Sequence, residues 1–148
     1  MSLKQWAENG WLRPHKTSAQ EIGNLLAIVE RDLKDASIRD LSPDARFTTA
    51  YNAALKLCTI CLYAEGYRAE RNMAHYRTIE ALPLILGADR SGDVDYLNTC
   101  RSKRNTSEYD YIDVVSDDDA DELIGFVGEL KDKVMTWLKS RHGKLVPS

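Results

Sequence analysis

The chain has 148 residues, of which 43% are hydrophobic and 29% charged, and its formal net charge is −3. This composition is typical of a single globular domain and excludes a disordered or low-complexity protein. A net negative charge also excludes a general nucleic-acid coat protein and leaves room only for a local basic patch. With three cysteines and no signal-like or long apolar segment, we expect a cytoplasmic protein that does not bind membranes.

Apolar residues spaced three and four apart predict helices along most of the chain. A first helix starts at the capping pair Ser18 and Glu21 and ends near residue 37. A second starts at Ser42 and Pro43, because serine caps a helix and proline fits its first turn, and it ends at Gly66. Its apolar face is wide, which indicates the central helix of a bundle.

The second half of the chain predicts three more helices. A short one covers about residues 76–86, where Pro83 should kink or end it early. Val94 opens a longer one. The last covers residues 117–142, with aspartates in its first turn and basic residues in its last, as the helix dipole favours. We therefore expect an all-α, up-and-down bundle of four main helices plus a short extra helix, without strands of useful length.

The expected organisation has three parts. Residues 1–17 form an N-terminal arm, which carries Trp6 and Trp11 and should pack onto the bundle or onto a second subunit. Residues 18–142 form the bundle, and residues 143–148 form a C-terminal tail.

Two patterns resemble metal sites but have simpler interpretations. Cys58 and Cys61 form a C-x-x-C pair, yet both lie in the middle of a predicted helix on its apolar face, so we expect buried thiols. The acidic run at residues 116–122 lacks the glycine and the ligand spacing of a calcium loop and fits a helix start instead. No metal and no cofactor is expected.

The segment CRSKRNTSEYDY, residues 100–111, places basic residues directly before two tyrosines in an acidic chain. At about 100° per residue, Arg104 lies within about 20° of Leu97 and Arg101 within about 40°, so both continue the apolar face of their helix. A buried guanidinium needs a carboxylate, helix carbonyls or a bound anion. Either Arg104 and Asn105 hold this helix to a neighbour, or the segment binds phosphate or RNA.

An Arg-Asn dipeptide near the end of the penultimate long helix, in an all-α bundle, resembles the HEPN superfamily (higher eukaryotes and prokaryotes nucleotide-binding domain). Active members carry R-x(4–6)-H, often as R-N-x-x-x-H-x-Y. Here Arg104, Asn105 and Tyr111 match, and Tyr109 occupies the position of the histidine. Residues 66–82 also resemble the glycine and H-x-x-x-[IL]-x-x-L pattern of these domains, with matches at Gly66, His75, Ile79 and Leu82.

The resemblance implies that the chain is related to proteins of which many are dimeric ribonucleases in toxin–antitoxin or defence systems. In such a mechanism the arginine binds the scissile phosphate and the histidine handles the proton. Tyrosine, with a pKa near 10, is a poor base at neutral pH, so we expect an RNA-, nucleotide- or partner-binding accessory protein that is catalytically weak or inactive. A homodimer is expected, with RNA, a nucleotidyltransferase or a toxin–antitoxin protein as the further partner. The expected binding residues are Arg101, Lys103, Arg104, Asn105 and Tyr111, of which Tyr111 is also a candidate for nucleotidyl modification.

Two other functions stay open. The chain is a metal-independent ribonuclease with Arg104 and Tyr109 at its centre, or it is a helical dimerisation module that binds no nucleic acid. Arg68 and His75 also satisfy R-x(6)-H and form an alternative pair, although they follow the second helix rather than precede the last one.

Overall fold

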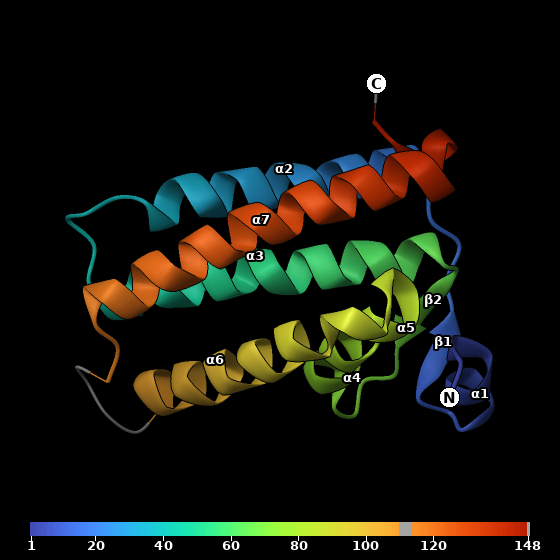
Figure 1. Ribbon diagram of the computed structural model, residues 1–148, viewed down its shortest axis with the longest axis horizontal. Coiled ribbons are helices and arrows are strands. Elements are labelled where there is room, and N and C mark those ends of the chain that lie inside the picture. The colour runs from blue at the N-terminus through green and yellow to red at the C-terminus, as the bar shows by residue number, and fades with distance from the viewer. Residues whose placement is uncertain (110–113, 148) are drawn as a thin grey trace.

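The computed structural model describes residues 1–109 and 114–147, with side chains for residues 1–106 and 114–147. It confirms the all-α bundle of four main helices. These are α2 (Ala19–Ala36), α3 (Pro43–Ala64), α6 (Ser91–Tyr109) and α7 (Asp117–Arg141). Successive long helices run in opposite directions, and α3 lies in the middle, packed against α2, α7 and α6 (Figure 1).

The short elements are more numerous than expected. They are α1 (Leu3–Glu8), β1 (Leu12–Pro14), β2 (Tyr67–Ala69), α4 (Ala74–Glu80), α5 (Leu82–Leu86), η1 (Ala88–Arg90) and η2 (Gly143–Leu145). Where the sequence predicts one short helix, the structure has two, α4 and α5, and Pro83 lies in the first turn of α5. Ending the helix ahead of Pro83 removes the steric conflict that proline causes inside a helix.

The strands correct the expectation of a chain without strands. β1 and β2 pair antiparallel, with Leu12 opposite Ala69 and Pro14 opposite Tyr67. Three residues are too few to show an alternating pattern. Their pairing joins segments far apart in the sequence, so it depends on how the N-terminal arm docks.

Three of the predicted helix starts are confirmed. The hydroxyl groups of Ser18, Ser42 and Ser116 each accept a hydrogen bond from the backbone N–H three residues later. At Ser116 the Asp119 carboxylate bonds back to the cap, which completes a capping box. Helix starts are therefore local properties of this sequence.

The core is centred on α3, whose side chains are buried on most of its surface. Cys58 and Cys61 lie within it, as the sequence predicts, and Cys100 joins them from α6. Burial raises the pKa of Cys58 to about 12 and that of Cys100 to about 11. These thiols are protonated at neutral pH and serve as small apolar groups.

The N-terminal arm packs onto the bundle. Trp6 and Leu12 form a small buried cluster with Leu62 of α3 and Ala81. His15 donates its backbone N–H to the carbonyl oxygen of Gly66 at 2.8 Å. No helix in the described ranges is both long and apolar enough to cross a bilayer.

Candidate functional site

The site begins where α6 changes from apolar to basic. Val94, Leu97 and Cys100 are buried against the core. Arg101 and Arg104 follow on the same side and are partly buried. The helical spacing therefore places two guanidinium groups at the end of a packed face, next to α3 and α4.

Arg104 lies on the core. Its Cζ atom is 5.4 Å from the centre of the Tyr51 ring, and its Nη1 donates to Oδ1 of Asn105 at 3.1 Å. Tyr51 is fully buried, and burial raises the pKa of its hydroxyl to about 12 although the charges of Arg104 and Arg101 act in the opposite direction. A buried ring of α3 thus supports a cation of α6.

Arg101 faces a hollow of about 370 Å³ beside α4. Its Cζ atom lies 5.8 Å from the centre of the Tyr76 ring. Its Nε atom is buried and makes no hydrogen bond with any group that the structure describes. The hollow is lined by Arg71, Met73, Ala74, His75, Tyr76 and Arg101.

A second hollow, of about 290 Å³, lies between α3, β2 and α4. Its polar and charged lining residues include Lys56 from α3, Arg68 from β2 and His75 from α4. Arg68 and His75, the alternative pair of the sequence, therefore line one hollow. His75 also lines the first hollow, so it joins the two.

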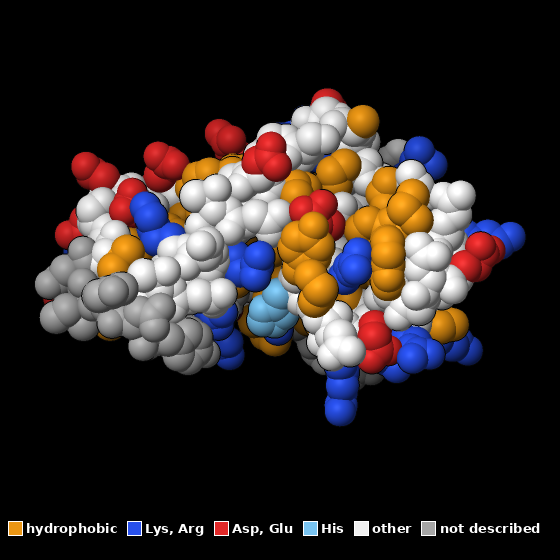
Figure 2. All heavy atoms as spheres, turned by 90° about the horizontal axis from the view of Figure 1, so that it is seen from below, with side chains coloured by type: hydrophobic (Ala, Val, Ile, Leu, Met, Phe, Trp, Pro, Cys, Tyr) orange, Lys and Arg blue, Asp and Glu red, His pale blue; other side chains and the backbone are white. Residues whose placement is uncertain are grey.

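The electrostatic surroundings of His75 are basic. Partial burial lowers the pKa of its imidazole, and the charges of Arg104, Lys56 and Arg101 lower it further. The imidazole is therefore neutral at pH 7, and three cations act on it. Figure 2 shows this face, with basic side chains on both sides of a histidine near the centre of the view.

The other sequence-predicted residues lie elsewhere. Lys103 pairs with Asp119 at 3.2 Å, which ties α6 to the first turn of α7. Asn105 accepts the bond from Arg104. Tyr109 is the last residue of α6, but its side chain and all of Tyr111 lie outside the described residues.

Sequence reasoning missed several residues of the site. Lys56 could have been noticed in the sequence, because it interrupts an otherwise apolar helix face. Nothing in the sequence pattern marks Arg71 or Tyr76 as site residues. Met73, the residue directly before α4, has a left-handed backbone with φ of 58°. This conformation is strained for a residue with a side chain and is often found beside functional sites.

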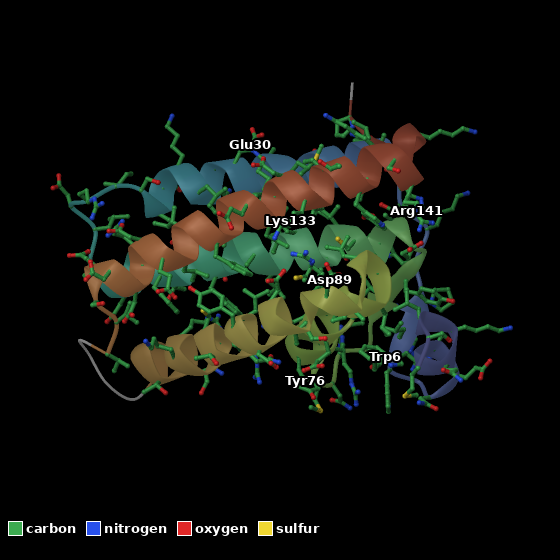
Figure 3. All side chains as sticks on the ribbon, in the orientation of Figure 1. Trp6, Glu30, Tyr76, Asp89, Lys133 and Arg141 are labelled. Atoms are coloured by element: carbon green, nitrogen blue, oxygen red, sulfur yellow. The ribbon has the colours of Figure 1, made fainter. Side chains whose placement is uncertain are left out.

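Another cleft, of about 500 Å³, lies between α7 and η1 and has mixed charge. Asp89 and Asp132 line it together with Lys133 and Arg141. Figure 3 labels Asp89, Lys133 and Arg141 in this region, whereas Tyr76 lies at the lower edge of the molecule. Since carboxylates offset the cations, this cleft is a weaker anion site than the hollows at His75.

Within residues 1–109 and 114–147, no group of three or more histidine, cysteine or acidic side chains is arranged to hold a metal ion. No model of a known protein family matches the chain, and no curated protein or solved structure matches it. Inference about function therefore starts from the site itself.

Proposed function

We propose that the protein binds RNA or nucleotides through their phosphate groups at His75 and the cations around it, as a HEPN-like accessory protein. The observation that carries this proposal is the concentration of positive charge around His75. Lys56 comes from α3, and Arg101 and Arg104 come from α6, yet all three act on one imidazole of α4.

Such a cluster of cations attracts anions. Like charges repel, and partial burial increases the repulsion because it reduces screening by water. The chain as a whole carries a net charge of −3, so the basic cluster is a local feature in an acidic protein. A phosphate group would relieve the repulsion, and guanidinium groups match its geometry with paired donors.

The experiment is a fluorescence anisotropy titration with a labelled RNA at several salt concentrations. Arg101→Gln should weaken binding and lower the slope of log K against log salt by about one, because one phosphate contact is lost. Lys133→Gln removes the same charge in the mixed cleft on α7 and is the matched control. Equal effects of the two variants would show that binding follows net charge rather than this site.

Metal-independent RNA cleavage is a second candidate, favoured by the neutral imidazole of His75 beside Arg104. His75 would take the proton of a ribose 2′-OH, whose oxygen attacks the adjacent phosphorus. Arg104 would stabilise the added negative charge. The P–O5′ bond then breaks and the protonated His75 returns its proton to the leaving oxygen, directly or through water, which leaves a 2′,3′-cyclic phosphate and a 5′-hydroxyl end.

This candidate is tested by incubating RNA with the protein in EDTA. Cleavage that is lost in His75→Gln and in Arg104→Ala would establish it, and Tyr109→Phe tests the tyrosine at the motif position. RNA that stays intact while it binds supports the accessory role instead.

We also propose a homodimer, on the resemblance of the sequence, and a nucleotidyltransferase or toxin–antitoxin protein as a further partner. Sedimentation measures the dimer association constant of the wild type and of Arg104→Ala. If this constant is unchanged in the variant while RNA binding is lost, the protein is not a dimerisation module alone.

A further inference from the structure

The two hollows at His75 share a wall. Ala74 and His75 line both of them, so the hollows lie on either side of the first turn of α4. The site therefore consists of two adjacent compartments.

The two compartments have the same chemistry. The first contains the cations Arg71 and Arg101 and the ring of Tyr76. The second contains the cations Lys56 and Arg68 and, as its ring, Tyr63. Each thus combines positive charge with an aromatic side chain, which is what a nucleotide requires for its phosphate and its base.

The aromatic side chains are held in place by their neighbours. The ring of His15 stacks on Tyr63 with 4.0 Å between ring centres. Two guanidinium groups, those of Arg77 and Arg101, lie near the ring of Tyr76, each with its Cζ atom 5.8 Å from the ring centre. In Figure 2 basic and hydrophobic side chains alternate across this face. Rings fixed in this way lose little conformational entropy when a base packs on them.

The size of the compartments limits what each can hold. They measure about 370 and 290 Å³, at the lower end of the range of about 300–1,000 Å³ for ligand sites. Each compartment therefore suits one unit of about the size of a nucleotide, and a ligand of two linked nucleotides can occupy both.

We infer that the site binds single-stranded nucleic acid, with consecutive nucleotides in the two hollows and the phosphate that links them at His75. This inference rests on the proposed function and adds the form of the ligand. A duplex does not fit, because its bases are stacked inside the helix and cannot reach the rings of Tyr63 and Tyr76.

The test is a competition experiment. A fluorescein-labelled RNA of ten nucleotides without self-complementarity is bound to the protein and displaced with AMP, with the dinucleotide pApA, or with a duplex of the same sequence as the ten-mer. We expect pApA to compete at least tenfold better than AMP, since stacking and charge contacts in the second hollow are gained together. The duplex should compete more weakly than the unlabelled single strand.

Variants at two exposed arginines test the two hollows one at a time. Arg71→Gln removes a cation from the first and Arg68→Gln one from the second. Each should weaken binding of the ten-mer on the order of tenfold, whereas Lys133→Gln should leave it unchanged. In Arg68→Gln the advantage of pApA over AMP should largely disappear. Circular dichroism confirms that each variant is folded.

The outcomes distinguish this inference from the proposed function. If AMP competes as well as pApA, or if Arg68→Gln binds the ten-mer like the wild type, a single hollow binds RNA and the two-compartment site is wrong. If the duplex competes as well as the single strand, the inferred form of the ligand is wrong. If the ten-mer does not bind at all, both proposals fail.

Discussion

Arg104 of α6 lies over the ring of Tyr51 of α3, with its Cζ atom 5.4 Å from the ring centre. Tyr51 is fully buried, so the position of this cation is set by the core. The hydroxyl of Tyr51 is buried and has no hydrogen-bond partner among the described residues. The ring rather than the hydroxyl is therefore the part of Tyr51 that matters for the site.

Replacing Tyr51 tests this relationship. Tyr51→Leu removes the ring under Arg104 and should weaken RNA binding about fivefold, the size of a partly desolvated cation–π contact of about 1 kcal/mol. Tyr51→Phe keeps the ring and removes an unsatisfied hydroxyl, so its affinity should match the wild type and its stability should be equal or higher. Anisotropy and urea unfolding measure the two effects. A loss of binding in Tyr51→Phe would contradict a role of the ring alone.

RNA binding should depend on pH through His75. Its pKa is lowered in the free protein, so the imidazole is neutral at pH 7, and a bound phosphate would raise that pKa by favouring the charged form. Affinity should therefore rise as the pH falls from 7.5 towards 5.5, by at most about tenfold if the pKa rises by one unit. The measurement is a series of titrations at constant ionic strength. In His75→Gln the RNA affinity should not change with pH. If the affinity of this variant changes with pH as much as that of the wild type, another group is responsible.

Arg46 joins three helices and should be important for stability. It is 1% exposed. Its Nε donates to the carbonyl oxygen of Ala36 at 2.8 Å, and its Nη atoms pair with Asp117 and Asp121 of α7. Arg46→Ala removes these bonds and leaves a cavity, so the free energy of unfolding should fall by about 2–4 kcal/mol. Urea unfolding measures the change.

Arg39 provides the matched control, because it also pairs with Asp121 but is 68% exposed. Arg39→Ala should change stability far less, since an exposed ion pair is screened by water. A similar loss in both variants would show that the pair with Asp121, rather than the burial of Arg46, is responsible.

The same contacts predict how stability changes in acid. The hydrogen bond from Arg46 lowers the pKa of Asp121 below its usual value of about 4. A lowered pKa in the folded state means that this contribution is present above about pH 4 and is lost as the pH falls through the lowered value. The stability difference between the wild type and Arg46→Ala should therefore narrow below about pH 4. Unfolding curves between pH 7 and pH 2.5 check this, and a constant difference would contradict it.

The thiols should be unreactive in the folded protein. Cys58, Cys61 and Cys100 are buried, and burial raises their pKa values. Labelling with a thiol reagent at pH 8 should be slow in buffer and complete in 6 M guanidinium chloride. Rapid labelling of the native protein would show that the C-x-x-C pair is accessible.

The local features of the fold could be predicted from the sequence. Serine caps at residues 18, 42 and 116 and the spacing of apolar residues depend on neighbours within one or two helical turns. The inward direction of Arg101 and Arg104 follows from the same periodicity, because a helix fixes the angle of each side chain. Pro83 likewise predicted the break that separates α4 from α5.

The candidate site could be predicted only in part. The sequence offered Arg101 and Arg104 by their place on α6, but it kept His75 in a separate pair with Arg68. The structure puts Arg68, His75 and Arg101 around one pair of hollows, because α4 packs against both α3 and α6. The charge of Arg104 acts on His75 from outside these hollows.

By itself, then, the sequence determined the long helices, their ends and the face that each buries, since hydrogen bonding and side-chain spacing within a helix are local. Only the tertiary structure decided that the charge of Arg104 acts on His75 and that β1 pairs with β2. These contacts join residues far apart along the chain, and they form only when helices dock and bury their apolar surfaces. No local pattern encodes which docked arrangement that burial selects.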